Sequence, residues 1–249
     1  MAGKLFIVGM GPGDASQMTE GAVSAIEHSE VIIGFSLYTA LLRRIFPEKK
    51  FISNGMQGEI ERAKVAIEMA ESGKNVAIVS SGDAGIYGIA SPVIEIVSRR
   101  SSVGFELKIV PGLSASSAVS SILGAPLAND FITLSLSDLL TPLDLIMDRI
   151  EFAGKFDLVI VLYNPRGSRF PDNFSKAMDI LKKYRKPETP VGIVRNAYRD
   201  KQSAKITNLA SVNPEELDML TTVVIGNSQT TVYKDLMYTK RGYSNKYDI

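Results

Sequence analysis

Short apolar runs alternate with longer amphipathic segments through the first half of the chain. Apolar runs between turn signals are typical of buried strands, whereas apolar residues spaced three and four apart are typical of helices. This alternation predicts an α/β fold with a mostly parallel sheet. The expected strands are residues 4–8, 31–33, 76–80 and 107–110, and the expected helices are residues 19–29, 37–46, 60–71, 92–99 and 114–123.

A turn-rich passage at residues 124–130, GAPLAND, interrupts both periodicities, and a second alternation follows it. The later elements are richer in strands with short connections, which predicts a mixed sheet. We therefore expect two consecutive α/β domains, residues 1–124 and 125–249, that form a cleft with the ligand site between them. The second-half strands are expected at 131–135, 158–163, 191–194, 204–207 and 223–225, and the helices at 143–152 and 174–184.

Composition narrows the chemistry. The 249 residues contain no cysteine and one histidine, which excludes disulfides, thiolate metal sites, cysteine nucleophiles and multi-histidine sites. His28 follows a helical pattern and is expected to complement that helix's dipole. A net charge of +1 provides no field that would attract nucleic acid. With no long apolar run and no signal-peptide pattern at the start, we expect a cytoplasmic enzyme without a membrane segment or a metal.

A glycine-rich loop, GMGPGD at residues 9–14, follows the first expected strand. Such loops hold dinucleotide pyrophosphates when a third glycine and a later acidic residue complete the motif. Here Asp14 occupies the place of the third glycine, Pro12 removes an amide, and the second apolar run ends without an acid. A tight turn or a loop facing a different ligand is the other interpretation, with Gly11, Pro12 and Gly13 as candidate substrate contacts.

Two more loops of small residues follow expected strands. Residues 80–88, SSGDAGIYG, carry three glycines and one carboxylate, and residues 111–117, PGLSASS, open a helix. Glycines leave backbone amides accessible to a ligand, and helix N-termini do the same. Both segments also fit simple structural roles, a glycine turn for the first and a helix cap for the second.

The motifs at residues 8–14, 81–88, 110–115 and 162–166 occur in an order that resembles the tetrapyrrole methylases, over nearly the whole chain. The segments at 124–131, 135–142, 189–192 and 240–243 are similar to the branch that methylates C17 of precorrin-3B, or of its cobalt form, and contracts the macrocycle in cobalamin synthesis. The resemblance implies S-adenosylmethionine as cofactor, a tetrapyrrole substrate and a homodimer. Ala84 stands where the family usually has proline.

By this resemblance, the cofactor contacts fall on residues that follow the expected strands. They are Gly82, Asp83, Ile86, Tyr87, Ser114, Ala115, Tyr163, Asn164, Asn196, Ala197, Gly226 and Asn227. The substrate carries several carboxylates, for which guanidinium and ammonium groups are suited partners. Arg166, Lys240 and Arg241 are the residues proposed for that contact.

The run FITLSLSDLLTP at residues 131–142 has two interpretations. Its hydroxyls and carboxylate face a ligand at a strand end, or Asp138 or Thr141 caps the helix after Pro142. Methyl transfer from a sulfonium needs alignment of the reactants, worth roughly 7–11 kcal/mol, and no protein nucleophile. The ring contraction that the resemblance implies needs acid–base groups. We assign that role to Asp130, Ser135, Ser137 and Asp138.

Three other hypotheses remain. The chain is a tetrapyrrole methylase acting at another ring carbon, a dinucleotide-dependent oxidoreductase using the loop at 9–13, or a sensor that binds the cofactor without turnover. The residues at 135–142 favour the C17 branch, and cofactor binding distinguishes the oxidoreductase from the rest.

Overall fold

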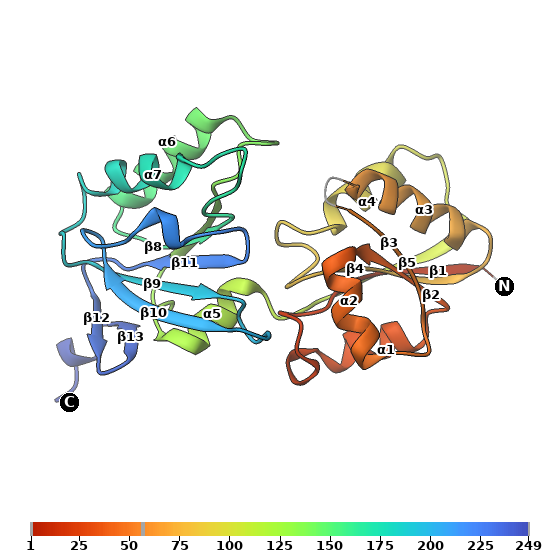
Figure 1. Ribbon diagram of the computed structural model, residues 1–249, viewed down its shortest axis with the longest axis horizontal. Helices are drawn as coiled ribbons and strands as arrows, with labels where there is room; N and C mark the ends of the chain where they lie inside the picture. The colour runs from red at the N-terminus through yellow and green to blue at the C-terminus, as the bar shows by residue number, and fades with distance from the viewer. Residues whose placement is uncertain (1, 56–57, 249) are drawn as a thin grey trace. The chain divides into compact units, whose positions relative to one another are not determined.

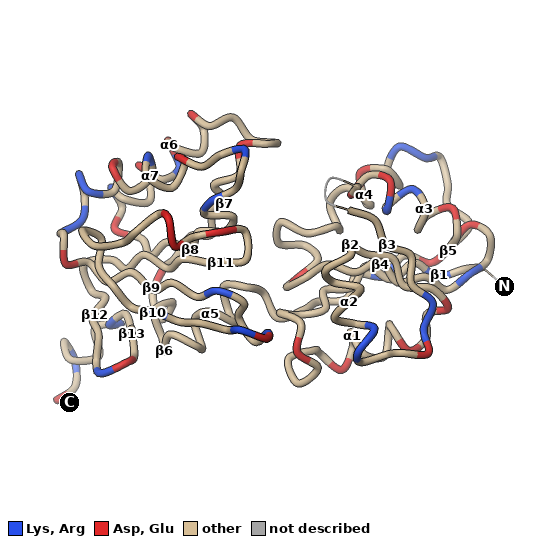
Figure 2. The backbone as a smooth tube through the Cα atoms, in the orientation of Figure 1, with Lys and Arg blue, Asp and Glu red and all other residues tan. Residues whose placement is uncertain are grey.

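The computed structural model describes residues 2–55 and 58–248, and the chain divides into two compact units, Met1–Ala115 and Ser116–Ile249. The division lies at the start of a helix, α5, rather than in the turn-rich passage after it. Each unit is built on its own five-stranded sheet. Basic and acidic residues are interspersed over each unit, in keeping with the net charge of +1 (Figure 2).

The first unit holds a sheet in the order β3-β2-β4-β1-β5, in which every pairing is parallel. The predicted parallel sheet is thereby confirmed. Its strands are β1 (Gly3–Gly9), β2 (Val31–Phe35), β3 (Lys50–Asn54), β4 (Asn75–Ser80) and β5 (Phe105–Val110). Its helices are the 3-10 turn η1 (Ala15–Gln17), α1 (Glu20–Glu27), α2 (Ser36–Ile45), α3 (Glu59–Glu71) and α4 (Ala90–Ser98).

Two apolar clusters cover the two faces of this sheet. α1 and α2 pack on one face, where Phe6 and Val8 point, and α3 and α4 pack on the other, where Leu5 and Ile7 point (Figure 1). The N-cap of α1 is Thr19, whose hydroxyl accepts a hydrogen bond from the Ala22 amide, and its C-cap is His28, both within the helix predicted at residues 19–29. Alternation of side chains along β1 thus places helices on both faces.

The second unit has a mixed sheet in the order β10-β9-β11-β8-β7, with β7 and β8 parallel and the other pairs antiparallel. This confirms the predicted mixed sheet. Its strands are β7 (Phe131–Ser135), β8 (Val159–Tyr163), β9 (Pro190–Arg195), β10 (Ser203–Asn208) and β11 (Thr221–Ile225). A smaller sheet contains β6 (Gly124–Ala125), β12 (Thr230–Tyr233) and β13 (Leu236–Thr239). The remaining elements are α5 (Ala115–Leu123), α6 (Leu143–Lys155), α7 (Asn173–Leu181), and the 3-10 turns η2 (Pro214–Glu216) and η3 (Tyr243–Asn245).

α6 and α7 cover one face of the second sheet, and α5 packs on the other (Figure 1). Behind α6 lies the buried Arg185, whose guanidinium donates to the carbonyls of Gly154, Ala153 and Leu158 and pairs with Asp157. A buried cation is tolerated only when such partners surround it. Arg185 therefore ties the end of α6 to the start of β8.

Four strands were not predicted: β3, β6, β12 and β13. β3 is an edge strand with a half-exposed pattern, and β6 has only two residues. β12 and β13 expose several of their side chains, including Tyr233 and Leu236. β13 buries Met237 and Thr239, but its exposed positions also carry apolar or aromatic residues, so its sequence does not alternate. The other three strands bury too few side chains to produce a period-two signal.

Three glycines pack the loops at the carboxyl edge of the first sheet. Met10 donates to Ser80 O at 2.9 Å, and Gly11 and Gly82 exchange two backbone hydrogen bonds of 3.1 and 2.8 Å. A Cβ atom on Gly9 would lie 2.7 Å from Gly112 N and 2.8 Å from Gly82 O. The loops after β1, β4 and β5 therefore touch through backbone that leaves no room for a side chain.

We expect Gly112→Ala to lower the free energy of unfolding of the first unit by about 2–4 kcal/mol, because its Cβ would overlap the carbonyl oxygens of Gly82 and Gly9. Gly104→Ala is the matched control, since no atom lies within 4 Å of its added Cβ. Urea unfolding of the two variants followed by circular dichroism measures the difference. Equal midpoints for both variants would contradict the close packing of the three loops.

Candidate functional site

Asp83 shapes the loop after β4. Its Oδ1 accepts a hydrogen bond from the Gly85 amide at 2.8 Å, and its Oδ2 accepts one from the Gly112 amide at 3.0 Å. The carboxylate therefore joins this loop to the loop after β5. The loop also needs Gly82, whose φ of +66° lies in the left-handed region. Asp83, predicted as a cofactor contact, thus has a structural task that keeps the small-residue loops together.

Beyond Asp83 the same loop presents apolar side chains to solvent. Ile86 is 40% exposed and Tyr87 is 57% exposed. Tyr87 also has a φ of +52°, which is unfavourable for a bulky residue and is found mainly where a site requires it. Ser114 is buried where α5 begins, and Ala115 follows it. An exposed tyrosine held in an unfavourable backbone conformation is a candidate ligand contact.

The loop after β1 is more enclosed than predicted for a substrate contact. Gly11 and Pro12 are buried, and Gly13 is partly buried. Asp14 caps η1 by accepting hydrogen bonds from the Ser16 hydroxyl at 2.6 Å and the Ser16 amide at 2.8 Å, and these bonds hold the pKa of Asp14 below its ordinary value. An ionised carboxylate in this loop disfavours a pyrophosphate there, which weakens the dinucleotide interpretation.

In the second unit, β7 and β8 end side by side. The register pairs Ser135 with Tyr163, and the Leu136 amide donates to Tyr163 O at 3.0 Å. Ser135 Oγ accepts hydrogen bonds from Asn164 Nδ2 at 3.0 Å and from the Ser137 amide at 3.3 Å. Two of the predicted catalytic serines and a predicted cofactor residue therefore form one hydrogen-bonded group at the strand ends.

Asp138 follows this group and is partly buried. The start of α6 at Pro142 has no side-chain cap, so the alternative that Asp138 or Thr141 caps this helix is contradicted. Next to Asp138, Leu139 is 51% exposed and Leu140 is 98% exposed. Large apolar side chains left in water beside a carboxylate are typical of a surface that a ligand covers.

β9 contributes to the same edge of the second sheet. It pairs antiparallel with β11, which pairs antiparallel with β8, so β8 and β9 run in the same direction. Asn164 and Asn196 follow these strands with φ values of +50° and +52°. Ala197 is next to Asn196, and the Tyr163 hydroxyl accepts a hydrogen bond from the Ser116 amide at 2.9 Å. The structure thereby brings four predicted cofactor residues, Tyr163, Asn164, Asn196 and Ala197, to one edge.

Arg166 lies in the loop after β8 at this edge and is already paired. Its guanidinium donates to Glu215 Oε1 at 2.7 Å, and the Arg166 side chain is 25% exposed while that of Glu215 is 73% exposed. A cavity of about 410 Å³ adjoins it, lined partly by Leu217, Met219 and Leu220. The guanidinium and these apolar neighbours are suited to a carboxylate on an apolar molecule.

The sequence pattern missed an ion pair beside this cavity. Arg195 Nε donates to Asp218 Oδ2 at 2.8 Å, and the Thr221 hydroxyl and Leu220 amide donate to Asp218 Oδ1. Burial raises the pKa of Asp218, but the bonds from Thr221, Arg195 and Leu220 together outweigh burial and leave that pKa below its ordinary value. No local motif marks Asp218 or Glu215, because their roles arise from strand pairing.

Five predicted site residues lie at the opposite edge of the second sheet. Asp130 precedes β7, and its carbonyl accepts from the Val159 amide at the start of β8. A strand of five residues separates Asp130 from Ser135 by about 17 Å. Gly226 and Asn227 follow β11, which runs against β8, and Asn227 Nδ2 donates to Asp157 O before β8. The structure therefore separates Asp130, Gly226 and Asn227 from the group around Ser135.

Lys240 and Arg241 are the other two of these five predicted site residues. The Lys240 amide donates to Gln229 O, and the Gln229 amide donates to the Asn227 side chain. This chain of contacts places both basic residues near the turn after β11, away from Arg166. Both are exposed. Of the three predicted substrate cations, only Arg166 lies at the edge that carries Ser135, Asn164 and Asn196.

Among the described residues, no helix is long and apolar enough to cross a membrane, and no group of three histidine, cysteine or acidic side chains is placed to hold a metal ion.

The chain is similar in sequence and structure to several known proteins. The chain is 46% identical over 252 aligned residues to the "Cobalt-factor III methyltransferase" of Priestia megaterium; the match covers 100% of this chain but 47% of that protein. It is 44% identical to the "Probable cobalt-factor III C(17)-methyltransferase" of Salmonella typhimurium, over 96% of this chain and 99% of that one. The crystal structure of the methyltransferase CobJ superposes with a TM-score of 0.89 at 32% identity, covering 96% of this chain and 100% of CobJ.

The model of the tetrapyrrole (corrin/porphyrin) methylases matches residues 4–213, which include both five-stranded sheets up to β10. The predicted fold and the predicted methyl donor are thereby confirmed. This chain belongs to the tetrapyrrole methylase family and is an S-adenosylmethionine-dependent methyltransferase.

Proposed function

We propose that the chain methylates C17 of a tetrapyrrole at the precorrin-3B stage, in its cobalt-bound form, during cobalamin synthesis. The observation that carries this proposal is the 44% identity, over nearly the full length of both chains, to a protein whose name specifies cobalt-factor III and C17. The Priestia megaterium relative is named for the same substrate, although this chain spans only about half of it.

The described residues fit the cofactor. S-adenosylmethionine supplies a methyl group that is already activated on a positively charged sulfur. The exposed Ile86 and Tyr87 side chains offer an apolar surface for its adenosine, and Ser114 and Ala115 offer the start of a helix. By the family resemblance, Asn164 and Asn196, which follow β8 and β9, are proposed as further cofactor contacts. Gly226 and Asn227 are left out of this set because they lie at the other edge of their sheet.

The tetrapyrrole is proposed to contact the loop at residues 136–142. Leu139 and Leu140 provide the exposed apolar surface that a macrocycle would cover, and Arg166 provides a guanidinium for one of its carboxylates. Ring contraction at this site requires proton transfer. We assign this proton transfer to Asp138, which follows the strand end held by the hydrogen bonds of Ser135.

The function is tested with cobalt-factor III and S-adenosylmethionine carrying a labelled methyl carbon. We expect one methyl group per turnover, located at C17 by NMR of the product, and binding of S-adenosylhomocysteine in calorimetry without binding of NAD or NADP. A labelled methyl group at another ring carbon would indicate a tetrapyrrole methylase that acts at that carbon instead of C17. Binding of a nucleotide alone would favour the oxidoreductase hypothesis, and cofactor binding without turnover of any tetrapyrrole would favour a sensor.

The ion pair between Arg166 and Glu215 leads to a prediction for the KM of the tetrapyrrole. Arg166→Ala should raise the KM for the tetrapyrrole about tenfold or more with little change in kcat, because it removes a charge-assisted contact. Glu215→Gln should lower the KM about two- to fivefold, since the substrate carboxylate no longer competes with Glu215 for the guanidinium. Steady-state kinetics measures both.

Glu216→Gln is the matched control, because Glu216 pairs with Lys205 and not with Arg166. Its KM should stay at the wild-type value. A KM that moves equally in the Glu215→Gln and Glu216→Gln variants would show a general charge effect and would contradict the Arg166 contact.

Asp130 precedes β7 and Asp138 follows it, so the two carboxylates are expected to differ in their effect on kcat. Asp138→Asn should reduce kcat for the ring-contracted product by about 10²- to 10⁴-fold, the usual contribution of a positioned acid or base. Asp130→Asn should leave kcat within a few-fold, because Asp130 lies at the other end of β7. Single-turnover assays with both variants check this, and a larger loss in Asp130→Asn than in Asp138→Asn would overturn the assignment.

The family resemblance also implies a homodimer, which we include in the proposal. Light scattering at micromolar protein concentration tests it, and a monomer mass would remove that part.

A further inference from the structure

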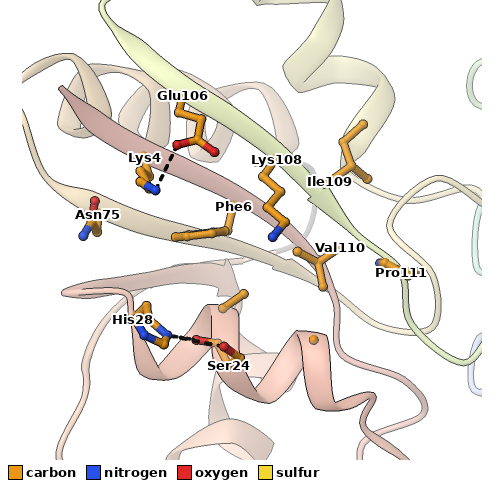
Figure 3. A pocket seen from close by; sticks show the side chains of 12 residues that line it. Lys4, Phe6, Ser24, His28, Asn75, Glu106, Lys108, Ile109, Val110 and Pro111 are labelled. Carbon is orange, nitrogen blue, oxygen red and sulfur yellow. Dashed lines mark hydrogen bonds and ion pairs between the residues drawn. The ribbon is translucent and has the colours of Figure 1, made fainter.

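A second cavity lies in the first unit between α1 and the edge strand β5. It has a volume of about 430 Å³ and is lined by residues of α1, β1 and β5 and by Asn75 (Figure 3). None of its lining residues belongs to the site proposed for methyl transfer. The following inference therefore does not depend on the proposed function.

The cavity exists because one face of β5 is left uncovered. β5 pairs with β1 in parallel, so Glu106, Lys108 and Val110 share a face with Lys4, Phe6 and Val8. The crossover helix α4 packs on the opposite face, with Phe105 and Leu107. On the first face α1 covers Phe6 but stops short of the edge, which leaves a groove beside β5.

The floor of the groove is apolar and aromatic. Phe6, Ala25 and Val110 line it, and each is less than a tenth exposed. The Phe6 ring lies between β5 and α1 in Figure 3. An apolar floor wide enough to include a phenyl ring is suited to a flat organic group.

The side chains around the groove include hydrogen-bond donors, and the Glu106 carboxylate among them is already paired with Lys4. Lys4 is neutralised by Glu106 at 2.9 Å, whereas Lys108 makes no hydrogen bond or ion pair with any residue in the described part of the chain. In Figure 3 the Lys108 side chain extends from β5 toward Phe6 and Val110. Across the groove, His28 Nδ1 lies 2.7 Å from the Ser24 carbonyl oxygen. A carbonyl oxygen can only accept a hydrogen bond, so Nδ1 is the donor.

We propose that this groove binds a small planar organic anion, an aromatic or heteroaromatic ring that carries one carboxylate, sulfonate or phosphate group. The ring lies on Phe6 and Val110, and the anionic group pairs with the Lys108 ammonium. An anionic group gains a charge-assisted contact with the exposed Lys108 ammonium and a neutral apolar molecule does not, which favours this class of ligand.

The single histidine makes the test direct, because the chain has one imidazole and hence one Hε1 signal in NMR. The probe is naphthalene sulfonate, a planar aromatic anion, titrated into the folded protein. We expect saturable binding of one equivalent that shifts the His28 signal. The Lys108→Met variant should bind about tenfold or more weakly, the usual effect of losing a charge-assisted contact.

Lys50→Met is the matched control, because Lys50 is an exposed lysine on β3, the other edge strand of the same sheet. It should bind the probe as the wild type does. Saturation with S-adenosylhomocysteine should not displace the probe from the His28 signal. An unmoved His28 signal, or equal affinity in the two lysine variants, would overturn the proposal. Inorganic phosphate shifting His28 as strongly as the probe would overturn the role of the aromatic floor.

Discussion

The close approach of three backbones is the constraint on which the first unit's loops depend. Gly9, Gly82 and Gly112 lie at or just after the ends of β1, β4 and β5 and pack closely together. A Cβ atom on Gly9 or on Gly112 would overlap the backbone of another loop. Asp83 completes the arrangement by accepting hydrogen bonds from two of these loops. Because the three strands are parallel, their loops leave the sheet at one edge, and the glycines allow them to touch there. The exposed Ile86 and Tyr87 are presented by this packed base.

The second unit reaches a comparable result by different means. Only β7 and β8 are parallel, and the remaining strands alternate in direction. Its loops are held by side chains: Ser135 joins the ends of β7 and β8 through Asn164, and Asp218 joins Arg195 to the turn before β11. Arg185 secures the opposite edge beside Asp157. Both edges are therefore held by polar side chains, and the loop after β7 also exposes the apolar Leu139 and Leu140.

Much of the fold followed from local pattern. The buried strands and amphipathic helices were predicted close to their observed bounds because burial imposes a period on the sequence. β3 and β12 were missed because they bury few side chains, and β13 was missed because its exposed positions carry Leu236 and Tyr238. For the candidate site, the loops after β4, β7 and β8 were predicted because small or polar residues directly follow apolar strands. Glu215 and Asp218 could not be found this way, since each matters through a partner that is distant in sequence.

By itself the sequence determined the kinds of elements, the absence of cysteine chemistry and the family, because these depend on composition, periodicity and local motifs. Only the tertiary structure decided which polar residues share an edge. Asp130 and Ser135 are close in sequence, yet they lie at opposite ends of β7. Asn227 follows a strand just as Asn164 does, but at the other edge. The physical reason is that the direction of a strand is set by the neighbours with which it pairs, and no local pattern of side chains encodes that direction.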